Sequence, residues 1–143
     1  MDQELYSKIH GSASLFRNTI ERMNKTNFPL SSWFERFPLG CCGDTSDLLA
    51  KYLTEEHSIE TLYVWGMRGE QSHAWLEHKN LIIDITADQF DEVNEPVMIT
   101  TDRTWHSQFV GQNPKSSDFD TFTDRNTVRL RTIYNNILSN MAL

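Results

Sequence analysis

Three residue types that together can break an amide bond follow one another along this chain. Neighbouring cysteines stand at 41 and 42, His73 lies in the segment Ser72-His-Ala-Trp-Leu-Glu77, and Asp84 lies in Leu81-Ile-Ile-Asp-Ile-Thr86. A thiol attacks a carbonyl carbon as the thiolate, so it needs a base to take its proton, and the base needs a partner that orients its ring. The order Cys, His, Asp therefore predicts a cysteine-dependent hydrolase or acyltransferase.

The surroundings of the two cysteines suit a nucleophile. Gly40 and Gly43 bracket the pair and permit close approach of a substrate backbone, and an apolar helical stripe follows them. A helix N-terminus favours a thiolate, and the amide of the nucleophile can help to hold an oxyanion. Periodicity alone does not say whether Cys41 or Cys42 is the nucleophile, and the other reading is a buried structural thiol.

The histidine and the aspartate belong to two strands that an even-numbered turn at Lys79-Asn80 would pair. That register places Trp75 opposite Asp84, and His73 joins them on the same face because strand side chains alternate. With another register, Asp88 would replace Asp84 as the orienting acid. The expected register also gathers the aliphatic side chains on the opposite face: Ala74, Leu76, Ile83 and Ile85.

Other side chains are candidates for contact with a substrate. Trp75 could wall the site and exclude water, and Gln71 is a weak candidate for an oxyanion donor. Trp105, in a long polar segment, could touch substrate, although a Trp that covers the core edge beside an exposed His106 is the more ordinary interpretation. We therefore expect substrate contacts at Gly40, Cys41, Gly43, Gln71, Trp75 and Trp105.

Hydrophobic periodicity predicts an α+β fold in which the nucleophile helix packs on a small antiparallel sheet with flanking helices. One domain is expected over 1–143, because no repeat, low-complexity tract or linker interrupts the chain. The expected elements are a helix from Leu5 to Met23 broken at Gly11, a helix from about Cys42 to Glu56, strands at Thr61–Met67, Ser72–His78 and Leu81–Ile85, a weaker strand at Pro96–Thr100, a loop or flap at Thr104–Asp124, and a helix at Val128–Met141.

Composition excludes several classes of function. The formal net charge of −7 argues against a nucleic-acid partner, and no apolar run is long enough for a membrane span or a signal peptide. A cytoplasmic protein is expected, with export by a route that reads no Sec signal as the alternative. Two adjacent cysteines form neither a disulfide framework nor a usual zinc chelate, so no metal and no cofactor are expected.

The motifs resemble those of transglutaminase-like proteins of the papain-like superfamily. The resemblance rests on Cys42-Gly-Asp-Thr-Ser-Asp-Leu-Leu, on the His-Ala-Trp strand at 73–75 and on Ile83-Asp-Ile-Thr86, where the family has Asp-Pro-Thr. It implies that Cys42 is the nucleophile, His73 the base and Asp84 the orienting acid, acting on amide bonds without a metal. Ile85 replaces the family's proline.

The resemblance implies a peptidase, amidase or deamidase working through a thioester, on a peptide, protein or small amide substrate. It leaves open hydrolysis or transfer to an amine, the oligomeric state, and whether the protein is a toxin or effector. The alternative function is a catalytically degenerate papain-like module that binds peptides or acts as an adaptor.

Overall fold

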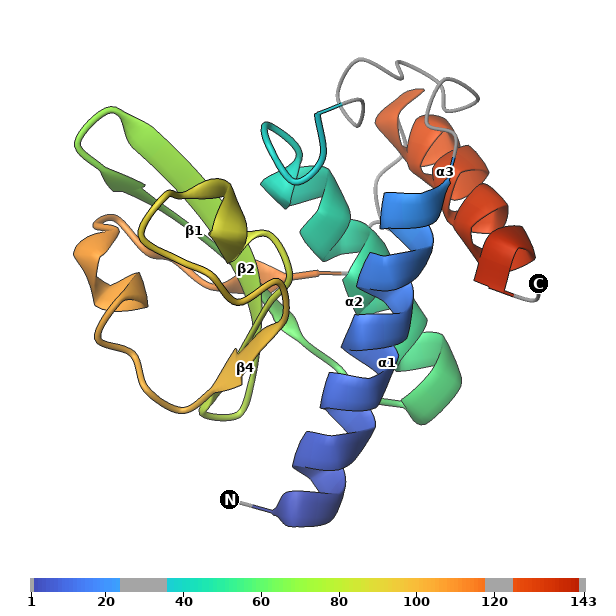
Figure 1. The fold of residues 1–143 in the computed structure, drawn as a ribbon, viewed down its shortest axis with the longest axis horizontal. Coiled ribbons are helices and arrows are strands. Elements are labelled where there is room, and N and C mark those ends of the chain that lie inside the picture. Colours follow the sequence, from blue (N-terminus) through green and yellow to red (C-terminus); the bar gives the residue numbers. More distant parts are fainter. Residues whose placement is uncertain (1, 24–35, 118–124, 142–143) are drawn as a thin grey trace.

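The computed structural model describes residues 2–23, 36–117 and 125–141. These residues form an α+β arrangement of three α-helices and one five-stranded antiparallel sheet (Figure 1). The elements are α1 (Gln3–Arg22), α2 (Cys42–His57), β1 (Leu62–Arg68), β2 (Gln71–His78), β3 (Leu81–Asp84), the 3-10 helix η3 (Ala87–Gln89), β4 (Met98–Thr100), the 3-10 helix η4 (His106–Gln108), β5 (Lys115–Ser116) and α3 (Arg125–Met141).

The sheet has the strand order β4-β3-β2-β1-β5. Two-residue turns join β1 to β2 and β2 to β3, since Arg68 pairs with Gln71 and His78 pairs with Leu81. The meander predicted from the sequence is therefore confirmed, including the register of its second hairpin. Continuing that register past the Leu76–Ile83 pair sets Trp75 opposite Asp84.

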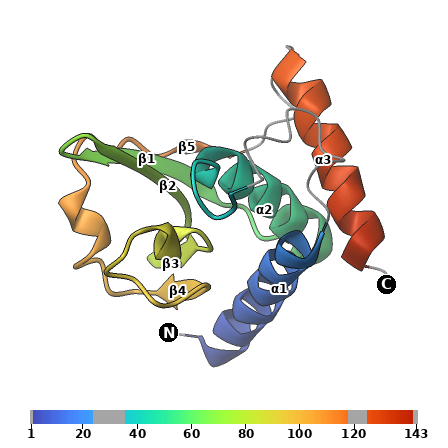
Figure 2. The same cartoon turned by 45° about the horizontal axis from the view of Figure 1, so that its top comes forward.

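The helices lie together on one side of the sheet, with α1 and α2 nearer to it and α3 outside them (Figure 2). The predicted break at Gly11 is wrong: α1 runs through this residue, where an added Cβ would meet no atom within 4 Å. Asp2 caps the first turn of α1 by accepting the amides of Glu4 and Leu5. A single exposed glycine therefore weakens the helix without ending it.

Helix α2 begins at the second cysteine, as the sequence predicts, and Cys41 is its N-cap residue. The carboxylate of Asp44, in the first turn, accepts hydrogen bonds from both terminal guanidinium nitrogens of Arg129 in α3, at 2.8 and 2.9 Å. This two-pronged ion pair ties α3 to the end of α2 that carries the cysteines.

The two faces of the sheet carry two different cores. The aliphatic core lies between the sheet and the helices and includes Leu76, Ile83 and Ile85 from the strands, with side chains from all three helices. The aromatic core lies on the opposite face; we define it as Val64, Trp75, Ile82, Phe90 and Phe109, with Trp105 packed against it. The predicted division of side chains between the faces of the hairpin is thus confirmed.

The segment from Thr100 to Ser117 crosses the aromatic face and returns to β1 (Figure 1). The loop or flap was predicted from Thr104 to Asp124, and its described part contains η4 and β5; residues 118–124 of that prediction lie outside the described residues. Met67 and Val110 exchange both backbone hydrogen bonds, at 2.9 and 2.7 Å. A Cβ on Gly66 would meet Cβ of Phe109 at 2.9 Å, so the glycine permits this close approach.

Within the described ranges, none of the helices combines the length and the apolar character that crossing a bilayer requires.

Candidate functional site

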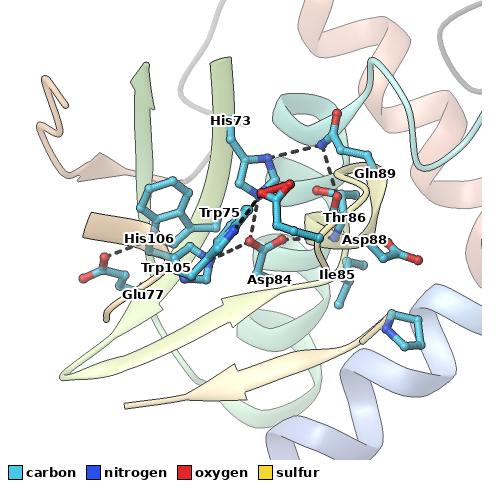
Figure 3. A network of polar contacts seen from close by, with 12 residues as sticks. His73, Trp75, Glu77, Asp84, Ile85, Thr86, Asp88, Gln89, Trp105 and His106 are labelled. Carbon is cyan, nitrogen blue, oxygen red and sulfur yellow. Dashed lines mark hydrogen bonds and ion pairs between the residues drawn. The ribbon is translucent and has the colours of Figure 1, made fainter. Parts of the chain in front are cut away.

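His73 and Asp84 meet at the centre of the aromatic face. His73 extends from β2 and Asp84 ends β3, and His73 Nε2 lies 2.7 Å from Asp84 Oδ2 (Figure 3). Both side chains are fully buried, with residue exposures of 0% and 1%. The diagonal pairing predicted from the hairpin register is therefore present in the structure.

A second histidine shares the same carboxylate oxygen. His106, the first residue of η4, places its Nε2 at 2.7 Å from Asp84 Oδ2 and is 1% exposed. The expectation of an exposed His106 is wrong, because the segment after β4 folds over the aromatic core and turns this ring inward. No sequence pattern indicated the contact, since it joins a loop to the end of a strand.

The local chain after β3 orients the carboxylate and the first histidine. Asp84 Oδ1 accepts the backbone amide of Thr86 at 3.1 Å. The Gln89 side-chain nitrogen lies 3.2 Å from His73 Nδ1 and also donates to the Thr86 carbonyl at 3.1 Å. Because the carboxylate accepts at Nε2, His73 carries a proton there, and Nδ1 is the ring nitrogen that gains or loses the second proton.

The charges of this cluster reinforce one another. Burial opposes protonation of His73, but the charge and the hydrogen bond of Asp84, together with the Cys42 sulfur as an acceptor, raise its pKa to about 9. Burial would raise the pKa of Asp84, yet His73 and His106 together hold that pKa well below its usual range. The aspartate is thus a carboxylate and His73 is an unusually strong base.

The two neighbouring cysteines have different surroundings. Cys41 is buried, and burial raises the pKa of its thiol to about 12. Cys42 is partly exposed, and its thiol is among the groups that raise the pKa of His73. Thiol reactivity requires the thiolate and access, and of the two neighbouring cysteines only Cys42 has the access.

Tyr63 is a neighbour of the helix start that sequence reasoning missed. A Cβ on Gly43 would lie 3.1 Å from the Tyr63 hydroxyl, so this glycine allows the ring to approach α2. Burial, together with the charges of Asp47 and Cys42, raises the pKa of the phenol above its usual range. Its hydroxyl therefore remains protonated beside the cysteine.

The remaining residues predicted to contact a substrate are dispersed. Trp75 is fully buried with its ring 5.6 Å from that of His73, which leaves it only the role of a wall. Trp105 is partly buried and packs on the aromatic core, and its ring lies 5.7 Å from that of His73. Gln71 is exposed and its amide oxygen accepts from Arg68, while Gly40 is exposed with a φ of 75°.

Asp88, the alternative candidate for the acid that orients His73, pairs with an arginine instead. Asp88 receives Arg17 of α1 through both carboxylate oxygens, at 2.7 and 2.9 Å. This ion pair ties η3 to α1, and Arg17 also donates to the Ile85 carbonyl at 2.7 Å. Asp88 therefore does not orient His73 in this structure.

The same cluster contains the atom types that bind metals. One donor atom each from His73, Asp84 and His106 lies within 4.8 Å of the others. Imidazole nitrogens and a carboxylate are ordinary ligands of first-row metals. A metal at the two Nε2 atoms would displace the protons that they donate to Asp84, so metal binding and the hydrogen-bonded state exclude each other.

Comparison with known proteins adds no name to this arrangement. No family model, no curated protein and no solved structure matches the chain, so the transglutaminase-like resemblance rests on its short motifs alone.

Proposed function

We propose that this protein is a papain-like cysteine hydrolase or acyltransferase in which Cys42, His73 and Asp84 act on an amide bond. The observation that carries the proposal is the buried pair of His73 Nε2 and Asp84 Oδ2 at 2.7 Å, with a partly exposed thiol interacting with the same ring. This combination supports a base oriented by a carboxylate and placed beside a nucleophile.

The reaction follows from the two nitrogens of His73. Nδ1 takes the proton of the Cys42 thiol, and the sulfur forms a bond to the amide carbonyl carbon. The carbonyl π electrons move to oxygen, where first-turn amides of α2 can donate hydrogen bonds. When the C–N bond breaks, the imidazolium returns its proton to the leaving nitrogen, which leaves a thioester on Cys42.

Deacylation uses the same base. His73 removes a proton from water or from an acceptor amine, which attacks the thioester carbonyl and releases the thiolate. Water gives hydrolysis, or deamidation when the amide is a glutamine side chain, and an amine gives transfer. Asp84 keeps its charge throughout and stabilises the imidazolium that forms at each step.

Alkylation of the two cysteines tests the proposal. Iodoacetamide would be applied at pH 6 and pH 8, with the modified peptides counted by mass spectrometry. We expect Cys42 to react at pH 6 at least about tenfold faster than Cys41, because only Cys42 has a base beside it. Cys41 serves as an internal control for unfolding, since its thiol becomes accessible when the helix start opens.

Variants identify the base. His73→Ala should abolish the preference for Cys42 at pH 6, and His78→Ala, which removes a histidine bonded to the Glu60 carbonyl at the far end of β2, should preserve it. Slow and equal labelling of both cysteines in the folded parent would refute the enzyme proposal and favour the adaptor alternative.

A further inference from the structure

We propose that His106 is a positioning residue for the catalytic pair, holding the Asp84 carboxylate in place as a neutral hydrogen-bond donor so that its charge serves His73. This inference deepens the proposed function, because it concerns the same pair of residues. It assigns a role to a histidine that the Cys–His–Asp mechanism leaves unused.

The carboxylate is fixed by donors from three directions. Oδ2 accepts from His73 Nε2 and from His106 Nε2, each at 2.7 Å, and Oδ1 accepts the Thr86 amide at 3.1 Å. Figure 3 shows these contacts converging on Asp84 from β2, from the turn after β3 and from η4. A carboxylate held only by His73 and the following turn could rotate about its χ angles, whereas a second donor on the same Oδ2 oxygen opposes that rotation.

The surroundings of His106 keep it a donor of one proton. Its Nε2 must carry hydrogen to bond the carboxylate, and its buried Nδ1 has no hydrogen-bond partner among the described residues. A second proton on Nδ1 would be a buried donor without an acceptor. The ring is enclosed by Trp75 and Trp105, each with its centroid 4.7 Å away.

The charges around these rings are already paired. Glu77 accepts from Trp75 and from Arg103, at 3.1 and 2.6 Å. Glu92 accepts from Trp105 and from Arg68, at 3.1 and 2.7 Å. Asp84 is therefore the carboxylate available to the two histidines, and a single negative charge stabilises a single imidazolium well.

The fold holds His106 in this position by several long-range contacts. Its backbone carbonyl accepts the side chain of Gln112 at 2.9 Å, and the hydrogen bonds between Met67 and Val110 tie the segment to β1. Gly66 faces His73 across the β1–β2 ladder and admits Phe109 beside it. The loop is thus built onto the strands that carry the pair.

Titration of His73 by NMR tests the role directly. The ring proton and carbon chemical shifts of His73 would be followed against pH in three proteins. These are the Cys42→Ser variant, and the same variant with His106→Phe or with His106→Gln. Phe fills the space without a donor, so the carboxylate should be free to rotate away from His73 and the measured pKa should fall by about 0.5 to 1. Gln keeps an N–H at a similar reach and should restore the parental value.

Two further measurements keep the test decisive. His78→Gln, a matched change at a histidine outside the site, should leave the His73 titration unaltered. In the unsubstituted protein, long-range ¹H–¹⁵N spectra should report the Nε2–H tautomer of His106 at neutral pH, a result that needs no variant to fold. A His106 ring protonated at Nδ1, or a folded His106→Phe protein with the parental His73 titration, would overturn the proposal.

The outcomes separate this inference from the proposed function. If His73→Ala abolishes Cys42 labelling while His106→Phe leaves the His73 titration unchanged, only the positioning role fails. If His106→Phe lowers the His73 pKa but Cys42 labelling is independent of His73, the enzyme proposal fails and His106 still positions the pair.

Discussion

The two faces of the sheet bury side chains of different chemistry: one face is aliphatic, and the other combines aromatic and polar side chains. The face toward the helices presents aliphatic side chains such as Leu76 and Ile83 to a large core, where burial of apolar area is the main stabilising effect. The opposite face surrounds His73, Asp84 and His106 with aromatic rings. Burying three polar side chains is tolerated there only because they bond one another.

The two faces should therefore respond differently to substitution. A substitution on the aliphatic face should change the free energy of unfolding without altering the titration of His73. A substitution on the aromatic face should alter that titration, or the loop that encloses it, at a smaller cost in stability. The four predictions below test this separation, from the largest effect to the smallest.

Leu76→Ala is expected to destabilise the protein by about 2–5 kcal/mol, because it leaves a cavity where a fully buried side chain packs against the helices. Urea denaturation at pH 6 measures the change. The His73 titration in the folded variant should match that of the parent. A shifted titration would mean that the two faces are coupled through β2.

Raising the pH should lower the free energy of unfolding, because His73 loses a proton that the folded state binds more tightly than the unfolded state does. The folded pKa of about 9 exceeds the ordinary value of 6.5, so this stabilisation is complete below pH 6.5 and is lost as the pH rises through 9. A Cys42→Ser background removes both the thiol that titrates and its share of the raised pKa, so we expect the free energy of unfolding to fall there by roughly 1–3 kcal/mol across this range.

The His73→Gln variant supplies the control for the pH series. Asp47, whose pKa is raised to about 7 by burial and by Asp44, also lowers stability as the pH rises toward neutrality. Both proteins share that contribution, so the difference between their pH profiles isolates His73. Parallel profiles from pH 6.5 to 9 would show that the histidine carries no extra proton affinity in the folded state.

Gly66→Ala should disturb the aromatic face selectively. The new methyl would lie 2.9 Å from Phe109 Cβ and 3.1 Å from the Val110 carbonyl oxygen, so the loop must move. Overpacking of this kind costs roughly 1–3 kcal/mol. Hydrogen exchange should accelerate at the amides of Met67 and Val110, while Gly11→Ala, at a site open to solvent, should leave those amides protected.

Cys41→Ala should have the smallest effect. The side chain is small and its thiol is removed from solvent, so we expect about 1 kcal/mol of destabilisation and an unchanged rate of Cys42 alkylation at pH 6. Cys42→Ala is the matched change, and it should abolish that fast alkylation with less effect on unfolding. A slower reaction of Cys42 in the Cys41→Ala protein would assign the first cysteine a part in the chemistry.

Most of the helices and strands, and the pairing of His73 with Asp84, could be predicted from the amino-acid sequence alone. Both lie in one hairpin with a two-residue turn, and the alternation of side chains along a strand leaves them one common face. The start of α2 at Cys42 was equally readable, because glycines precede an apolar stripe of helical period. These features depend on backbone geometry over a few residues.

The side chains that surround the His73–Asp84 pair depend on how distant segments fold onto the sheet. His106 and Gln89 reach Asp84 and His73 because the chain after β3 folds back over the aromatic face, and no local pattern encodes that path. The two cysteines are equivalent in sequence, yet packing buries one and leaves the other accessible. Local periodicity fixes the direction of a side chain within its own element, whereas its neighbours depend on how distant segments dock, which in turn depends on close approaches such as that of Phe109 to Gly66.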